Sequence, residues 1–163
     1  MNLAKSSIIA AAGLISLAAF FPTAGAAQEF KVSDLRGDYA FKFQGTLLQN
    51  GNPVPIAAVG VLTLDGQGRV TKATRFLNVA GMIVRQTATG TYTVNADGTG
   101  TSAFDVVPAA GQPAFFPPTR EVFQFTLVSR SRGFGLTGAV RAANGDDIGL
   151  LTIAAVEFVR QVP

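Results

Sequence analysis

The 163-residue sequence contains no cysteine, no histidine and no tryptophan. Without cysteine the chain forms no disulfide, so its stability has to come from a packed core. Without histidine and cysteine it can build neither a Ser-His-Asp or Cys-His nucleophilic site nor a zinc or copper site of imidazole and thiolate ligands. Any acid–base chemistry would rest on Asp, Glu, Tyr, Lys or Arg. We expect no metal and no cofactor.

Charged residues are also sparse. The chain has 13 Lys and Arg against 10 Asp and Glu, a net charge of +3, and the densest basic pair is Arg130 and Arg132 around one serine. A nucleic-acid groove needs clustered cations with interleaved aromatic residues. The sequence therefore argues against a nucleic-acid partner.

The N-terminus has the pattern of a secretory signal peptide. A single cation is followed by an apolar run over 8–21 and then by small residues that form an A-x-A-like cleavage site after Ala26 or Ala27. The run has about 14 residues, fewer than the roughly 20 that a membrane-spanning helix needs. An uncleaved membrane anchor is the alternative interpretation of this segment. We expect residues 1–27 to be removed and one domain over 28–163 to be exported, to the periplasm or out of the cell.

The rest of the chain consists of short segments in which apolar and polar residues alternate. In the first of them Tyr39, Phe41 and Phe43 share one face, and Lys42 and Gln44 take the other. A period of two is typical of a sheet with one solvent-exposed face, and no segment has the period of an amphipathic helix. We predict eight strands, over 37–48, 54–64, 69–78, 82–94, 99–107, 120–128, 133–142 and 147–160.

The string VNADGTGT at 94–101 raises the question of whether Asp97 binds calcium or turns a hairpin. The string LDGQGRV at 64–70 repeats its Asp-Gly-x-Gly pattern, and Asp-Gly is favoured in tight hairpins. A calcium loop needs about six to eight oxygens, mostly from several acidic side chains. Neither Asp65 nor Asp97 has an acidic neighbour within its turn, so we interpret both strings as hairpin corners.

Eight consecutive strands with short corners close most economically into a barrel, which leaves no exposed sheet edge. A two-sheet sandwich is the alternative, but only the segment 108–119 is long enough for one of its crossovers. Insertion into an outer membrane is disfavoured because the aromatic residues cluster in mid-strand rather than in girdles. We predict an all-β fold, an eight-stranded antiparallel up-and-down β-barrel.

Gly37-Asp38-Tyr39, at the start of the first strand, resembles the G-x-W opening of the calycins, the superfamily of lipocalins and avidins, with Tyr in place of Trp. The corner-rich meander also resembles the barrel of allene oxide cyclases and dirigent proteins. The calycin resemblance implies that a basic residue from the end of the last strand, here Arg160, packs across the Tyr39 ring. It makes these two residues the core and the cap of a closed barrel end.

The longest break between strands, over 107–120, contains four prolines and Phe115-Phe116. Its prolines exclude a central strand, and loops at barrel mouths admit ligands. The two phenylalanines form either an apolar lid over a ligand cavity or a plug in the barrel end, since an eight-stranded interior holds either side chains alone or one small ligand. The candidate ligand-binding residues are Tyr39, Phe41, Phe43, Tyr92, Phe115, Phe116, Phe123 and Phe125.

The segments 54–64 and 147–160 are apolar on both faces. A closed meander places them on either side of the first strand, so they would present an apolar patch to the exterior, and such patches mark interfaces. We expect a homo-oligomer, a dimer or trimer, through 54–64 and 147–160. Cover by the N-terminal arm 28–35 or by the loop 107–119 is the alternative.

Glu157 and Asp105 are the candidate catalytic residues. Glu157 shares a strand face with Ile153, where a carboxylate is costly unless it is paired, for example with Arg120 or Arg141. A buried acid with a perturbed pKa can act as a general base, whereas an ion pair at a strand end would make either carboxylate structural.

Three functions remain open at this point. The first is binding of a small apolar molecule inside the barrel. The second is a cyclase- or dirigent-like enzyme that acts on an apolar substrate there, with Glu157, Asp105 or a tyrosine assisting. The third is a solid structural or interaction barrel without a ligand. The volume of the cavity separates the third function from the others, and a carboxylate with a raised pKa inside the cavity separates the second from the first.

Overall fold

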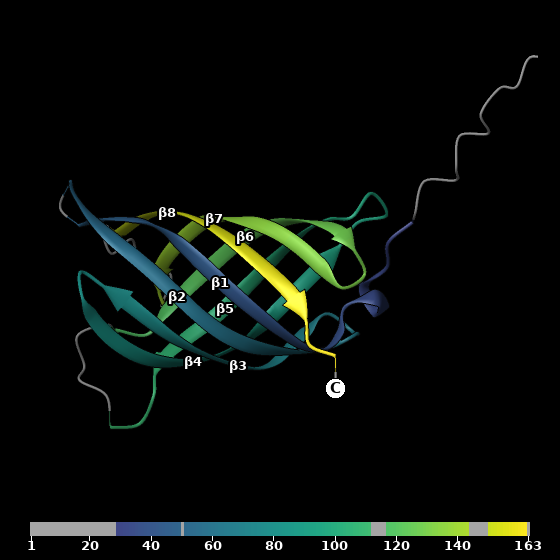
Figure 1. Ribbon diagram of the computed structural model, residues 1–163, viewed down its shortest axis with the longest axis horizontal. Coiled ribbons are helices and arrows are strands. Elements are labelled where there is room, and N and C mark those ends of the chain that lie inside the picture. The colour runs from purple at the N-terminus through teal and green to yellow at the C-terminus, as the bar shows by residue number, and fades with distance from the viewer. Residues whose placement is uncertain (1–28, 50, 112–116, 144–149, 163) are drawn as a thin grey trace, which may run out of the picture.

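The computed structural model describes residues 29–49, 51–111, 117–143 and 150–162. They form one closed antiparallel barrel in which each strand pairs with the next and β1 also pairs with β8 (Figure 1). This closure confirms the predicted up-and-down barrel and excludes the sandwich. No helix in these residues is long and apolar enough to cross a membrane. The strands are β1 (Arg36–Gln49), β2 (Asn52–Asp65), β3 (Arg69–Val79), β4 (Met82–Val94), β5 (Thr99–Pro108), β6 (Thr119–Ser129), β7 (Arg132–Ala142) and β8 (Leu150–Arg160).

The alternation read from the sequence is the alternation between the inside and the outside of the barrel. On β1 Tyr39, Phe43 and Leu47 are buried, whereas Lys42 and Gln44 are exposed. Because successive side chains of a strand point to opposite faces, every strand contributes one row of residues to the interior. The apolar row of each strand therefore builds the core.

Three glycines on the inner face lie beneath phenylalanine rings of a neighbouring strand. A Cβ atom added to Gly60 would lie 2.7 Å from the Phe41 ring, which is its partner in the register of β1 and β2. Glycine at these positions gives the ring room to lie against the sheet. The pairs are Phe41 with Gly60, Phe125 with Gly100, and Phe158 with Gly133.

The two Asp-Gly-x-Gly strings are hairpin corners, as predicted. Asp65 Oδ1 accepts hydrogen bonds from the backbone N–H groups of Gln67, at 2.7 Å, and Arg69, at 3.0 Å, between β2 and β3. Between β4 and β5, Asp97 Oδ1 accepts from the Thr99 hydroxyl, at 2.7 Å, and from its backbone N–H, at 2.9 Å. These bonds use the carboxylates to fix the turns.

Acid should therefore weaken the fold through these corners. The backbone hydrogen bonds from Arg69 and then Gln67 lower the pKa of Asp65, and the bonds from Thr99 lower the pKa of Asp97, below the ordinary value of 3.8. A lowered pKa in the folded state means that this stabilisation is complete above pH 3.8 and disappears as the pH falls through the folded-state pKa. We expect the urea midpoint to fall below about pH 4, and to fall less in the Asp65→Asn/Asp97→Asn variant. An equal fall in both proteins would contradict this account.

The N-terminal arm closes one end of the barrel. It contains the 3₁₀ turn η1 (Val32–Asp34) and lies at the same end as the end of β8 (Figure 1). Leu35 is 2% exposed, and the Phe30 N–H donates to the Ala96 carbonyl at 3.0 Å. The Tyr92 hydroxyl donates to the Leu35 carbonyl at 2.7 Å. The described part of the arm thus covers the barrel end and not the outer faces of the apolar strands.

Tyr39 is completely buried at this end, and its hydroxyl donates to the Arg130 carbonyl at 3.2 Å. Burial raises the pKa of Tyr39 above 10.0. Its ring meets Phe158 edge-on, with centroids 6.1 Å apart. Arg160 is opposite Tyr39 in the β1–β8 register and places its guanidinium beside Gly37. The ring contact of Tyr39 in the described structure is thus with Phe158, and the cation–π contacts of the described residues do not include the Arg160–Tyr39 stack implied by the calycin resemblance.

Strands β2 and β8 present apolar side chains to the exterior, but not as one patch. Val59 on β2 is 59% exposed, and Ile153 on β8 is 67% exposed, with Val159 also exposed. β1 lies between these strands and pairs with both. Its outward residues Lys42 and Gln44 are polar and exposed, so they separate two apolar surfaces that we expected to be continuous.

Candidate ligand cavity inside the barrel

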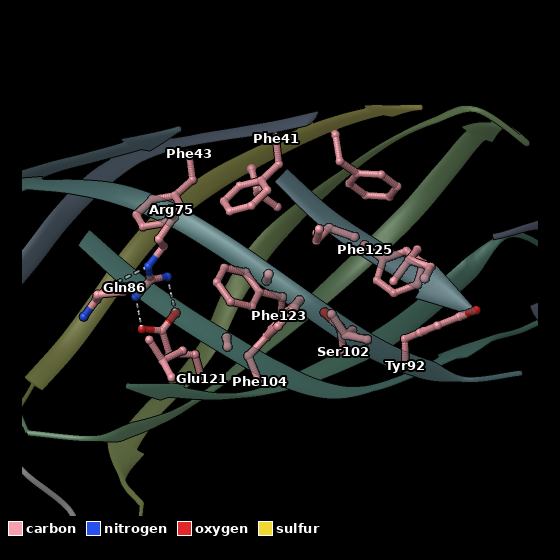
Figure 2. Close-up of a pocket in the computed structure, with 18 of the residues that line it drawn as sticks. Phe41, Phe43, Arg75, Gln86, Tyr92, Ser102, Phe104, Glu121, Phe123 and Phe125 are labelled. Carbon is pink, nitrogen blue, oxygen red and sulfur yellow. Dashed lines mark hydrogen bonds and ion pairs between the residues drawn. The ribbon is translucent and has the colours of Figure 1, made fainter. Parts of the chain in front are cut away.

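The barrel contains a cavity of about 90 Å³ whose surface is almost entirely apolar. It extends from Leu35 and Tyr92 at the closed end to a polar layer around Arg75 (Figure 2). Phenylalanine rings from four strands form most of its wall. These phenylalanines are Phe41, Phe43, Phe104, Phe123, Phe125 and Phe158.

The space exists because two neighbouring inward positions carry small side chains. Ala73 on β3 and Ala88 on β4 are partners in the register, and both line the cavity. Other inward positions of these strands carry larger residues such as Leu77 and Val84, which are buried. A pair of methyl groups at this place leaves volume that the phenylalanine rings do not fill.

A buried ion pair crosses the interior at one end of the cavity. Arg75 Nη1 and Nη2 donate to the two carboxylate oxygens of Glu121 at 2.7 and 2.6 Å, and Arg75 Nε donates to Gln86 Oε1 at 2.7 Å (Figure 2). The Arg75 guanidinium also lies 5.4 Å from the centroid of the Phe43 ring. Arg75 is 8% exposed and Glu121 is 7% exposed. These bonds offset the loss of hydration of two charged groups.

A second, smaller space of about 50 Å³ shares this polar layer. Arg75, Gln86 and Glu121 line both spaces, whereas Leu47 and Val79, near the turns of the opposite barrel end, line only the second. The polar layer thus divides the interior into an apolar cavity toward the closed end and a narrower space toward the loops.

Two buried polar groups at the cavity are not used by the fold. Within the described part of the chain, the Ser102 hydroxyl has no hydrogen bond, although Ser102 is only 8% exposed and lines the cavity (Figure 2). Gln86 uses its oxygen for Arg75, and its amide nitrogen donates to no described residue. Among the described residues no completely enclosed side-chain N or O atom lacks a partner, so both groups keep some accessible surface.

Most of the predicted ligand-binding residues that the structure describes line the cavity, while Tyr39 does not. Tyr92 also lines the cavity, and its hydroxyl donates to the Leu35 carbonyl at the closed end. Burial raises the pKa of this hydroxyl. Phe115 and Phe116 lie outside the described residues, so their interpretation as lid or plug stays a prediction. The predicted residues in the wall are Phe41, Phe43, Tyr92, Phe123 and Phe125.

The two candidate catalytic carboxylates lie on the exterior. Glu157 pairs with Lys42, at 3.1 Å, and Arg132, at 2.6 Å, and not with Arg120 or Arg141 as we considered. Hydrogen bonds from Lys42 and then Arg132 lower its pKa, whereas a general base inside a cavity would need a raised one. Asp105 is 56% exposed and pairs with Arg120 at 2.8 Å. No group of three or more His, Cys, Asp or Glu in the described ranges could hold a metal ion.

Sequence reasoning missed the polar residues that do face the interior. Arg75 lies on the same inward face of its strand as Ala73 and Leu77, and Glu121 lies on the same inward face as Phe123. A charged or polar residue in phase with an apolar row is the signal that could have identified both. The same signal identifies Ser102 on β5, which is opposite Phe123 in the β5–β6 register.

Comparison with known proteins gives only likeness of structure. No family model matches the sequence, and no curated protein matches it. A structure described as EF1p2_mFAP2b bound to DFHBI has 11% identity and a TM-score of 0.46, over 80% of this chain and 97% of that chain. A redesigned beta barrel, b11L5F_LGL, has 13% identity and a TM-score of 0.44, over 81% of this chain and 96% of that chain. At these values neither likeness supports an argument about what this chain binds.

Proposed function

We propose that this chain is an exported protein that binds one small apolar molecule inside its barrel. The observation that carries the proposal is the cavity between the Ala73–Ala88 pair and the phenylalanine wall. A ligand there would gain the dispersion contacts that the wall atoms lack in the empty protein.

The volume of the cavity limits the size of the ligand. An engineered apolar cavity of about 150 Å³ in another protein stays dry and takes up benzene or xenon. The cavity here measures about 90 Å³. We therefore infer a ligand of no more than about six non-hydrogen atoms, the number in benzene, bound by shape and apolar contact.

Filling the cavity should abolish binding and stabilise the fold. Hexane titrated into the protein should shift the backbone NMR signals of the inner residues of β3 and β4 in a saturable way. In Ala88→Leu the added side chain occupies the ligand volume, so we expect no saturable shift and about 0.5–2 kcal/mol more unfolding free energy.

The matched control is Thr89→Leu, which adds the same side chain at the next, outward and exposed position of β4. It should leave hexane binding unchanged. Ala73→Val tests the same volume from β3 in case Ala88→Leu does not fold. The proposal fails if the native chain gives no saturable shift, or if the filled variants bind hexane as well as the native chain does.

We also propose that residues 1–27 direct export and are removed, and that the mature chain over 28–163 functions in the periplasm or outside the cell. The support is the charge, apolar length and small-residue ending of this segment. Because the sequence has no cysteine, export to an oxidising compartment would add no disulfide, and the core alone has to stabilise the exported fold.

Self-association through the outer apolar face of β7 and β8 is a further part of this proposal. Ile153 on β8 and Leu136 on β7 are 67% and 63% exposed on neighbouring strands. Native mass spectrometry of the exported protein should give a dimer or trimer of the chain without its first 27 residues. Ile153→Glu should dissociate it, whereas Thr91→Glu, at an exposed position of β4, should not. A monomeric native chain would exclude this interface.

A further inference from the structure

We propose that the cavity selects uncharged ligands that carry one oxygen acceptor, such as a small ketone, and rejects carboxylates of the same size. This inference rests on the proposed function, because it specifies the chemistry of a ligand in that cavity. It follows from two features of the interior: the charge balance of the polar layer and the Ser102 hydroxyl that the fold leaves unused.

The charge balance disfavours an anionic ligand. Arg75 is the one described cation that lines the cavity, and both of its Nη atoms are already bound to the Glu121 carboxylate. The two opposite charges leave no net charge in the layer. A carboxylate that entered the cavity would therefore lose its hydration without gaining an unpaired cation, and would also approach Glu121.

The unused hydroxyl of Ser102 favours an acceptor. Ser102 lines the cavity and its hydroxyl can donate a hydrogen bond, whereas the Gln86 amide nitrogen points away from the phenylalanine wall (Figure 2). Ser102 lies opposite Tyr92 and Phe123 in the registers of β4–β5 and β5–β6, so the aromatic wall surrounds it. A carbonyl oxygen at Ser102 would satisfy a buried donor that otherwise lacks a partner, while the rest of the ligand contacts phenylalanine.

The first test compares methyl propyl ketone, hexane and butyrate, which have equal numbers of non-hydrogen atoms. Affinities are measured at neutral pH by the NMR titration described above, in the native chain and in Ser102→Ala. We expect Ser102→Ala to weaken ketone binding about three- to tenfold, the range for one neutral hydrogen bond. Hexane binding should change less than about twofold, because hexane makes no hydrogen bond. Butyrate should not bind the native chain.

The second test removes the negative charge of the polar layer. In Glu121→Gln the Arg75 charge loses its partner, so butyrate should give a saturable shift that it does not give with the native chain. The control Asp105→Asn removes an exterior carboxylate that pairs with Arg120, and it should give no butyrate binding. Because Glu121→Gln disturbs a buried pair, the Ser102→Ala comparison stands alone if that variant does not fold.

The outcomes separate this inference from the proposed function. If hexane binds the native chain but Ser102→Ala weakens ketone and hexane equally, the inference is wrong and the cavity is a purely apolar site. Butyrate binding to the native chain as tightly as the ketone would also overturn it. If neither hexane nor the ketone binds, the proposed function itself fails.

Discussion

Replacing Glu121 by leucine should lower the free energy of unfolding by about 3–5 kcal/mol, the largest loss we expect from one charged residue. Glu121 accepts two hydrogen bonds from Arg75 in a place where both side chains are only 10% exposed. Without the carboxylate, the Arg75 charge would remain buried among phenylalanine rings, and Gln86 would be its one hydrogen-bond partner among the described residues. Urea unfolding followed by circular dichroism measures the loss.

The double variant Arg75→Leu/Glu121→Leu separates the pair from the packing. Removing both charges leaves no buried ion, so most of the lost stability should return, since such replacements are often neutral or stabilising. Asp105→Leu serves as a control because its pair with Arg120 is half-exposed, and should change stability by less than about 1 kcal/mol. Equal losses in the single and double variants would show that the Arg75–Glu121 contact is not what stabilises this layer.

Phe125→Ala should cost about 3–5 kcal/mol, as expected when a large buried aromatic side chain is truncated. The Phe125 ring meets Phe158 at right angles, with centroids 5.8 Å apart. It also lies over Gly100 and beside Gly135, which have no side chains of their own to move into the space it would leave. The variant should therefore keep an enlarged cavity.

The control for this prediction is Val128→Ala on the same strand. Val128 points outward and is 60% exposed, so its truncation should change stability by less than about 0.5 kcal/mol. The enlarged cavity gives a second measurement: Phe125→Ala should admit ligands larger than hexane. A loss of stability below about 1 kcal/mol would mean that the ring is not part of the packed core.

Strand positions were predictable because period-two alternation and Gly-rich corners are local signals. The predicted strand over 82–94 coincides with β4, and the corners at Asp65 and Asp97 are where the sequence places them. Closure followed from the number of strands and the short connections. These features depend on a few neighbouring residues, which a single sequence contains in full.

The direction of Glu157 was not predictable in the same way. Its strand is apolar on both faces, so the pattern does not say which row points inward. The register with β1 decides it: Glu157 is opposite Lys42, which is exposed. That register is a long-range property of the closed barrel.

The cavity and its polar layer are harder to predict from the sequence. Volume inside a barrel is what remains after side chains from all strands have packed, and small differences in ring position change it. The alanine pair at Ala73 and Ala88 and the inward charges at Arg75 and Glu121 can be found once inward rows are assigned. Their contacts depend on which strands face each other across the barrel.

A crystal of the mature protein under xenon pressure tests the central claim most directly. Xenon occupies dry apolar cavities and scatters strongly enough to be located. We predict one interior xenon site between Ala73, Ala88 and the phenylalanine wall, absent from Ala88→Leu. An interior without xenon, with the phenylalanine rings filling the space beside the alanines, would contradict the account and make the barrel a solid one.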